Sequence, residues 1–180
     1  MGGVIRRITS QDVATYRKIR LRALQDAPTA FASTYAESLE LPDEHWQQRA
    51  AVAASGGDAT VFLAFLTDGE DECVGLAGGF RNEEDGRHAD VDLISMWVAP
   101  SHRGTGVAEQ LVDAVLDWAR DEAQAQVVGL WVTRGNAAAQ RLYERLGFVE
   151  TGDVQPLPSD PCKDEVRMVF GLRAPSTTGA

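Results

Sequence analysis

The sequence predicts an α/β domain of the α+β kind, in which strands and helices share one core. Apolar runs of strand length alternate with segments whose apolar residues recur at helical spacing. Residues 103–108 form a glycine-rich turn between a strand-like run and a helical one. The chain has 180 residues with 44% hydrophobic content, which is enough for one well-buried core and short for two. We expect one domain over residues 1–173 and a disordered tail over 174–180.

The N-terminal third is predicted to hold one strand and three helical segments. Val4 begins a short β-branched run, and Thr9 is followed three residues later by Asp12, the pattern of a helix start. Pro42 then separates two helical pieces. The expected elements are a strand over residues 4–8, a helix ending near residue 26, and helices over 35–41 and 43–54.

Three strands are expected next, because β-branched and apolar residues cluster in runs between polar, turn-forming segments. The acidic turn at 68–72 suggests a hairpin between the first two strands, and a loop at 82–88 leads to the third. The strands are expected over residues 60–67, 73–80 and about 89–98.

The C-terminal half is predicted to alternate helix and strand. Apolar residues at helical spacing from Ala139 to Leu146 mark one face of a helix, which Gly147 can end in a left-handed cap. Three prolines within residues 153–161 predict a loop there. The other expected elements are a helix from the glycine-rich turn to about residue 122, a strand over 127–133 and a closing strand over 166–172.

Composition excludes several kinds of partner and site. The net charge is −10 and the chain has only two lysines, Lys18 and Lys163, so we expect no nucleic-acid partner. The acidic excess permits a cationic acceptor, although many soluble proteins carry such an excess for solubility alone. Cys73 and Cys162 stand far apart without the spacing of a metal site, so we expect neither a disulfide nor a bound metal.

The N-terminal residues and the hydropathy predict a cytoplasmic protein with no membrane partner. Residues 1–7 lack the apolar run of a signal peptide, and Arg6 stands where a myristoylation signal has Ser or Thr. No window reaches the length of a membrane span.

The run from Asp92 to Val98 and the turn that follows it have the features of an anion site. Backbone N–H groups at the start of a helix lack partners inside it and carry the positive end of the helix dipole. Gly104 and Gly106 let a phosphate or pyrophosphate approach that backbone closely. Glycines at a strand–helix junction also serve packing alone, so the turn by itself leaves both interpretations open.

A second segment, behind the strand at 127–133, turns this pattern into a family resemblance. The two segments resemble the acetyl-CoA-binding motifs of the GCN5-related N-acetyltransferase (GNAT) family, an Arg/Gln-x-x-Gly-x-Gly/Ala turn and a later Asn-x-x-Ala-x-x-Leu-Tyr-x-x-x-Gly-Phe pattern. The matching residues are Arg103, Gly106 and Ala108 in the turn, and Asn136, Ala139, Leu142, Tyr143, Gly147 and Phe148 in the later segment. The resemblance is closest over residues 90–148.

The resemblance implies the GNAT fold, a mixed and mostly antiparallel sheet flanked by helices on both faces. Its fourth and fifth strands, here about 89–98 and 127–133, are expected to splay into a V-shaped cleft for the pantetheine arm of acetyl-CoA, the implied cosubstrate. Main-chain groups of Met96, Trp97 and Val98 would bind that arm. The other implied acetyl-CoA contacts are Arg103, Gly104, Thr105, Gly106, Val107, Ala108, Asn136 and Tyr143.

The reaction that the resemblance implies is acyl transfer from the thioester to a primary amine by direct attack in a ternary complex. Tyr143 matches the family's general acid near the CoA sulfur, although its place on the apolar helix face also suits core packing. Asp92 is the candidate general base, because it matches an acidic residue early in the fourth strand of many members. Glutamate is commoner at that position, so a water relay from the shorter Asp is the alternative. A solvated strand-end carboxylate is the other interpretation of Asp92.

We expect the acceptor to be a small-molecule amine, because the N-terminal segment resembles stand-alone GNAT proteins often associated with such amines. Trp131 stands where N-terminal protein acetyltransferases of the family carry a glutamate, which argues against ribosomal-protein substrates. The residues expected near the acceptor are Phe31, Tyr35, Glu37, Trp46 and His88.

Other functions stay open at this point. The chain could be a non-catalytic acetyl-CoA-binding sensor or partner-binding module, or an acetyltransferase for protein N-termini or lysines. A dinucleotide-binding fold is a weaker alternative, because the glycines at 104 and 106 lack the third glycine of that motif. GNAT proteins are often dimers, so a homodimer is also compatible with the resemblance.

Overall fold

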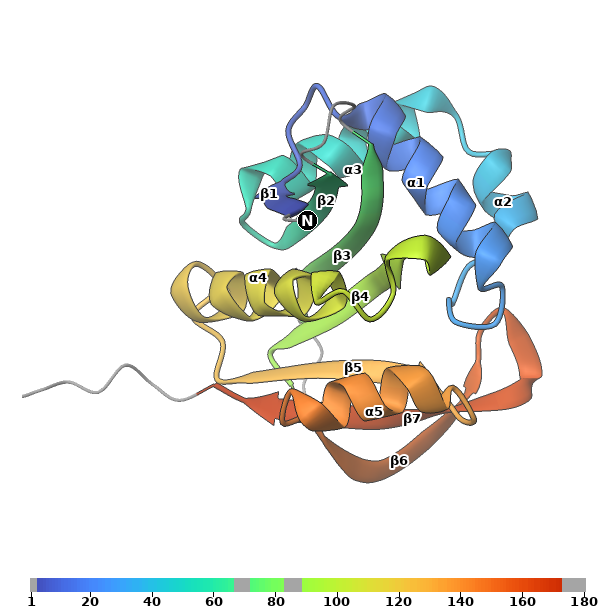
Figure 1. Ribbon diagram of the computed structural model, residues 1–180, viewed down its shortest axis with the longest axis vertical. Helices are drawn as coiled ribbons and strands as arrows, with labels where there is room; N and C mark the ends of the chain where they lie inside the picture. The colour runs from blue at the N-terminus through green and yellow to red at the C-terminus, as the bar shows by residue number, and fades with distance from the viewer. Residues whose placement is uncertain (1–2, 67–71, 83–88, 173–180) are drawn as a thin grey trace, which may run out of the picture.

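The computed structural model describes residues 3–66, 72–82 and 89–172 (Figure 1). Its strands are β1 Gly3–Arg7, β2 Ala59–Leu66, β3 Cys73–Arg81, β4 Val91–Val98, β5 Val127–Thr133, β6 Val149–Leu157 and β7 Asp160–Gly171. Its helices are α1 Val13–Asp26, α2 Tyr35–Leu39, α3 Asp43–Ser55, α4 Val107–Asp121 and α5 Ala137–Arg145, with a short 3₁₀ turn, η1, at Pro100–His102. His88, the tail predicted at 174–180 and most of the segments predicted at 68–72 and 82–88 lie outside the described residues.

The strands of the described part form one sheet in the order β1-β2-β3-β4-β5-β7-β6. Neighbouring strands are antiparallel except β4 and β5, which run parallel and are joined by α4. α4 packs across β1 to β4, while α3 packs on β2 and α1 on β3 and β4 (Figure 1). Consecutive residues of β3 are buried, as expected for a strand covered on both faces. The predicted mixed, mostly antiparallel sheet flanked by helices is therefore confirmed.

β4 and β5 separate soon after they meet. They pair at only two positions, Val91 with Val128 and Asp92 with Gly129. The register between β3 and β4 then shifts, and Ser95 has a φ of 58°, a left-handed conformation that marks a bulge in β4. Bulges bend a strand, so β4 turns away from β5 and the two enclose the predicted V-shaped cleft.

Most of the apolar residues of α4 are buried where this helix crosses the sheet. Trp118 of α4 is 2% exposed and donates from its indole N–H to the Gly56 carbonyl at 2.7 Å. A Cβ at Gly79 of β3 would lie only 2.7 Å from the Trp118 ring, so the glycine leaves room for the indole. None of the helices among the described residues is long and apolar enough to cross a membrane.

The segment at 153–161 is not the loop that the sequence predicts. It contributes the end of β6 and the start of β7, which form an antiparallel pair. β6 is an edge strand, so the missing N–H group of Pro156 removes little from the ladder, and the register shifts between Pro156 and Leu157. The prediction was wrong because it treated all three prolines as strand breakers, whereas Pro158 lies in the turn between the strands and Pro161 lies in β7 before its pairing with β5 begins.

α1 begins later than the sequence predicts. Thr9 does not cap it. Instead, the Asp12 carboxylate accepts hydrogen bonds from the N–H and hydroxyl of Thr9, both at 2.7 Å, and from the Arg6 guanidinium at 2.8 Å. Residues 9–12 therefore form a turn, and α1 starts at Val13. The bond to Arg6 outweighs the opposing effect of burial and holds the pKa of Asp12 well below its ordinary value.

The predicted end of the helix at 139–146 is confirmed. Gly147 has a φ of +96°, and its N–H donates to the Glu144 carbonyl. The Phe148 N–H donates to the Tyr143 carbonyl, which completes a Schellman motif. This cap holds the last turn of α5, and with it Tyr143, in place.

Candidate active site

The glycine-rich turn joins η1 to α4 and presents backbone donors. Gly104 and Gly106 have φ values of +75° and +88°, which residues with a Cβ rarely adopt. The Thr105 hydroxyl donates to the His102 carbonyl at 2.6 Å and closes the turn. α4 begins at Val107 without a side-chain cap, so its first N–H groups have no partner inside the helix. A Cβ on Gly104 would meet no atom within 4 Å, so this surface of the turn is open to a ligand.

Arg103 connects the turn to α1 and β4. Its Nε donates to the Val98 carbonyl at 3.0 Å, and its guanidinium forms an ion pair with Asp26 at the end of α1. The Trp97 indole donates to the same carboxylate at 2.9 Å. Burial would raise the pKa of Asp26, but the bonds from Trp97 and Arg103 outweigh it and lower that pKa. A contact between Arg103 and pyrophosphate stays a prediction.

A cavity of about 350 Å³ lies between the end of α1, β4, the turn and α5. Most of the residues predicted to bind acetyl-CoA line it, namely Met96, Trp97, Val98, Arg103, Gly104, Ala108, Asn136 and Tyr143. Thr105, Gly106 and Val107 do not, and Val107 is buried in the core. The structure thus brings the two sequence motifs to one cavity, which we call the cofactor cavity.

Asn136 has a structural bond as well as a place in the cofactor cavity. It is the N-cap of α5, and its Oδ1 accepts a hydrogen bond from the Ala139 N–H at 3.3 Å. Because Oδ1 is used in capping, the Nδ2 group is the part of the side chain that can donate to a ligand.

A second cavity, of about 440 Å³, adjoins the first. It lies among α1, α3, β4, β5 and β7 and has both catalytic candidates, Asp92 and Tyr143, in its lining. The residues that line both cavities are Ala30, Phe31, Met96 and Tyr143. Tyr143 therefore lies at the junction between the cofactor cavity and this one, which we call the acceptor cavity.

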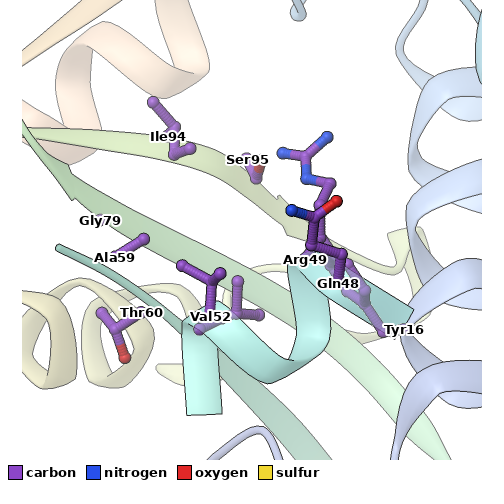
Figure 2. Close-up of a pocket in the computed structure, with 11 residues that line it drawn as sticks. Tyr16, Gln48, Arg49, Val52, Ala59, Thr60, Gly79, Ile94 and Ser95 are labelled. Carbon is purple, nitrogen blue, oxygen red and sulfur yellow. The ribbon is translucent and has the colours of Figure 1, made fainter. Parts of the chain in front are cut away.

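The acceptor cavity continues into a smaller one, of about 240 Å³, between α3 and the sheet (Figure 2). Arg49 of α3 and Ile94 and Ser95 of the β4 bulge line both. Figure 2 shows Arg49 projecting from α3 on the same side of this space as Ser95. The apolar part of its lining includes Val52, Ala53, Ala59 and Val61.

Tyr143 is protonated across the neutral range. Its side chain is 6% exposed and packs edge-on against Phe148, with ring centroids 5.7 Å apart. Burial raises the pKa of the phenol well above its ordinary value. A buried, protonated phenol can donate a proton or a hydrogen bond to charge that develops beside it.

Asp92 is a buried member of an ion pair and not the solvated carboxylate that the sequence left open. It is 3% exposed, and its Oδ1 accepts from Arg167 Nη2 at 2.5 Å. Arg167 belongs to β7 and reaches Asp92 across Gly129, where a Cβ would come within 2.3 Å of the guanidinium. The same guanidinium lies 5.3 Å from the centre of the Trp131 ring.

Glu165 of β7 is a second carboxylate in the acceptor cavity. It is 7% exposed and accepts a hydrogen bond from Gln155 at 2.6 Å. Burial raises its pKa, which outweighs the opposing effects of Gln155 and Arg167. Sequence reasoning missed this residue, because it precedes the predicted closing strand at 166–172. Side chains two apart in a strand point to the same face, so the spacing of Glu165 and Arg167 could have indicated two charged groups on one face of the sheet.

The residues predicted near the acceptor are only partly brought together. Phe31 lines both cavities, whereas Tyr35, Glu37 and Trp46 line neither. Glu37 completes a capping box at the start of α2, and Trp46 is buried against Tyr16. Among the residues that the structure describes, no cluster of His, Cys, Asp and Glu could hold a metal ion.

Comparison with known proteins places this architecture in a family. The family model described as "Acetyltransferase (GNAT) family" matches residues 21–148, which include the glycine-rich turn, both catalytic candidates and all the residues that line the cofactor cavity. The chain belongs to the GNAT family. The resemblance that the two motifs predicted is confirmed.

Two curated relatives of this GNAT chain are N-acetyltransferases by name or product. N-acetyltransferase 8B of Homo sapiens is 34% identical over 89 residues, which are 49% of this chain and 39% of the relative. N-acetylaspartate synthetase of Xenopus tropicalis is 37% identical over 86 residues, which are 48% of this chain and 30% of the relative. The matched part is therefore less than half the length of either relative.

The GNAT fold is also shared along the whole chain with a solved structure. The protein yncA from Salmonella typhimurium, solved with its cofactor acetyl-CoA, superposes with a TM-score of 0.74. The alignment covers 100% of this chain and 99% of that one at 21% identity. At 21% identity this similarity shows a shared fold and no more.

Proposed function

We propose that this protein is an acetyl-CoA-dependent N-acetyltransferase that transfers the acetyl group to a primary amine of a small molecule. The observation that carries the proposal is the position of Tyr143 at the junction of two cavities. One cavity is lined by the acetyl-CoA motifs of the GNAT family, and the other contains carboxylates that can accept a proton. A two-substrate transfer needs these two spaces to meet at one reacting point.

Acetyl-CoA fits the residues of the cofactor cavity. The open surface over Gly104 and the uncapped start of α4 offer backbone N–H groups to a pyrophosphate. Beyond Asp92, no strand of the described part pairs with the β5-facing edge of β4, so Met96 and Trp97 have main-chain groups for the pantetheine arm. The solved relative from Salmonella typhimurium carries acetyl-CoA as its cofactor, which supports the same ligand here.

The residues at the junction can divide the chemistry between them. The neutral amine attacks the thioester carbonyl carbon, the C–N bond forms, and the C–S bond breaks as the tetrahedral intermediate collapses. The buried phenol of Tyr143 donates its proton to the leaving thiolate and is then reprotonated from solvent. The proton lost by the attacking nitrogen passes to a carboxylate in the acceptor cavity.

Asp92 and Glu165 are the two candidates for that proton acceptor. Asp92 remains a candidate because it lines the acceptor cavity, although its Oδ1 is held by Arg167 at 2.5 Å. Glu165 lines the same cavity, and burial raises its pKa, which makes its carboxylate a stronger base than an ordinary glutamate. We therefore favour Glu165 as the base and assign Asp92 to positioning the cleft.

A small acceptor suits the acceptor cavity better than a polypeptide does. Its volume of about 440 Å³ is in the range of small-molecule sites, and it lies among buried strands. Trp131, in place of the glutamate of N-terminal protein acetyltransferases, fills part of its wall. The name of the relative N-acetylaspartate synthetase indicates an amino acid as that protein's acceptor, which also supports a small amine.

The proposal is tested by ligand stabilisation followed by turnover. The melting temperature is measured with acetyl-CoA, CoA and NAD, because a ligand at ~100 times its dissociation constant adds about 2.7 kcal/mol of stability. Release of free CoA is then measured over a panel of amines and N-terminal peptides. We expect stabilisation by acetyl-CoA but not by NAD, and thiol release with small amines.

Each other result has a defined meaning. Stabilisation without release would favour the non-catalytic sensor, and release with peptides alone would favour a protein acetyltransferase. An absence of stabilisation by acetyl-CoA would overturn the proposed function.

A further inference from the structure

Arg20 places a guanidinium in the wall of the acceptor cavity, and one of its nitrogens, Nη1, has no hydrogen-bond partner. Its side chain belongs to α1, and the residue is only 7% exposed. Nη2 donates to the Ser33 hydroxyl at 3.0 Å, and the guanidinium stacks over the Phe31 ring at 4.6 Å. Nη1 is buried without a hydrogen-bond partner. Arg20, Ser33 and Phe31 all line this cavity, so these contacts hold the Arg20 side chain at its wall.

A second cation, Arg49 of α3, lines the same cavity and also the smaller cavity shown in Figure 2. Burial lowers the pKa of Arg20 to about 10, and the charge of Arg49 contributes a smaller part of this decrease. Arg20 is therefore still charged at neutral pH. Within the part of the chain that the structure describes, neither arginine forms an ion pair with a carboxylate.

Two neighbouring cations without a carboxylate partner among the described residues repel each other, and Arg20 is also buried, whereas Arg49 is exposed. A buried guanidinium that lacks a partner loses its hydration without compensation, and a like charge adds repulsion. Both penalties are relieved when an anion enters the cavity. Arginine binds carboxylates with paired N–H groups, so a carboxylate is the anion that suits Nη1 of Arg20 and the nearby Arg49.

We propose that the acceptor is an amine that also carries a carboxylate, such as an α-amino acid, and that Arg20 and Arg49 bind this carboxylate. The inference rests on the proposed function, because it identifies the substrate class of the same site. Arg20 and Arg49 come from α1 and α3, whereas Glu165 and Tyr143 come from β7 and α5. The carboxylate and the amine of one acceptor would thus be held by different elements of the cavity wall.

The side chain of such an acceptor also has a place. The smaller cavity shown in Figure 2 opens beside Arg49 and has Val52, Val61 and Ile94 in its wall. Apolar groups gain free energy when they leave water for such a surface. Amino acids with apolar side chains are therefore expected to be better acceptors than charged ones.

The test compares matched amines on matched variants. Thiol release from acetyl-CoA is measured with leucine, phenylalanine and methionine, and with the amines that lack their carboxylates: isopentylamine, phenethylamine and 3-(methylthio)propylamine. Aminoalkyl phosphonates are added to separate a carboxylate site from a general anion site. The variants are Arg20→Met and Arg49→Gln, and Arg17→Met, a partly exposed position on the same helix that pairs with Asp43, is the control.

We expect the amino acids to exceed their decarboxylated partners by roughly 10- to 100-fold in kcat/KM, since bonds between charged groups are stronger than neutral ones. Arg20→Met should remove most of this preference by raising the KM for the amino acid, while the KM for acetyl-CoA stays the same. Arg17→Met should keep the preference. Circular dichroism and the melting temperature show whether each variant is folded.

Binding keeps the inference testable without turnover. Calorimetric titration of amino acids and their decarboxylated amines into the protein with bound CoA measures the carboxylate's contribution directly. Turnover without a carboxylate preference, or a preference unchanged in Arg20→Met, would overturn the inference and leave the acetyltransferase standing. A higher kcat/KM with the aminoalkyl phosphonates than with the amino acids would also overturn the inference. Carboxylate-dependent binding without turnover would support the inference while the proposed function failed.

Discussion

Arg167 of β7 reaches across Gly129 of β5 and forms a buried ion pair with Asp92 of β4, with 2.5 Å between Nη2 and Oδ1. The pair lies at the last position where β4 and β5 are hydrogen-bonded, Asp92 with Gly129. It therefore ties three strands together at the apex of the cleft. An enzyme whose two substrates meet in an opening between strands needs that apex to be rigid.

The first prediction concerns this ion pair. Asp92→Leu or Arg167→Met alone should lower the free energy of unfolding by about 3–5 kcal/mol, because each removes one member of a buried ion pair. The double variant Asp92→Leu/Arg167→Met should recover most of the loss. Urea unfolding of the four proteins gives the coupling energy. Additive losses in the double variant would show that the two side chains are not coupled.

Even a methyl side chain at Gly129 is predicted to lower the stability of the fold. A Cβ there would lie 2.3 Å from the Arg167 guanidinium and 2.9 Å from the Cβ of Ala89. Gly129→Ala should therefore cost about 1–3 kcal/mol of stability through overpacking. Gly171→Ala, on β7, is the matched control, because nothing lies within 4 Å of its added Cβ. Thermal unfolding measures both, and equal effects would contradict the proposed contact.

Tyr143→Phe separates acid catalysis from packing. Phenylalanine keeps the edge-on contact with Phe148, so stability should change by less than about 0.5 kcal/mol. Loss of the hydroxyl should lower kcat by roughly 100-fold, with little change in the KM for acetyl-CoA. Steady-state kinetics check both values. An unchanged kcat would mean that Tyr143 only packs at the junction of the cavities.

The raised pKa of Glu165 predicts how stability and kcat/KM depend on pH. Its pKa is raised in the folded protein, so the folded state binds its proton more tightly than the unfolded chain does. Its contribution to stability is therefore greatest below the unfolded pKa and is lost as the pH rises through the folded pKa. Glu165→Gln should remove this decline, and it should also remove the acidic limb of the kcat/KM profile.

The melting temperature and kcat/KM of Glu165→Gln are measured from pH 4 to pH 9 beside Glu144→Gln, an exposed position on α5. Glu144→Gln should follow the unmodified protein in both curves. If Glu165→Gln retains full activity at every pH while Asp92→Asn loses it, the base is Asp92.

Arg103 should affect CoA affinity through the position of the turn. Arg103→Ala removes the bonds to the Val98 carbonyl and Asp26, and we expect a several-fold rise in the dissociation constant of CoA without loss of binding. Asp26→Asn should produce a smaller rise of the same kind. The lowered pKa of Asp26 means that its stabilising contribution is present above the unfolded pKa and is lost as the pH falls through the folded pKa. Fluorescence titration with CoA measures the affinity, and an unchanged dissociation constant in Arg103→Ala would contradict this role.

Local chemistry in the sequence was enough to predict most of the elements, and the family resemblance led to residues that the fold brings to one cavity. The strand at 127–133, the glycine turn before α4 and the left-handed cap at Gly147 each depend on neighbouring residues, and all three are found as predicted. The loop predicted at 153–161 was wrong, because whether a proline is tolerated depends on its place at the edge of the sheet.

The acceptor side was decided by the tertiary structure alone. Arg20 of α1, Arg49 of α3 and the β7 residues Glu165 and Arg167 come from three elements far apart in the chain, and no local spacing relates these elements. The sequence left Asp92 as either a general base or a solvated strand-end carboxylate, and the fold brings the Arg167 guanidinium of β7 to it. The sequence analysis did not single out Arg20, whose Nη1 is buried without a hydrogen-bond partner. Periodicity and turn chemistry act over a few neighbouring residues, so the sequence by itself determined where helices and strands form. Burial and charge pairing act through space between residues far apart in the chain, so only the packed fold determined which side chains share the cavity.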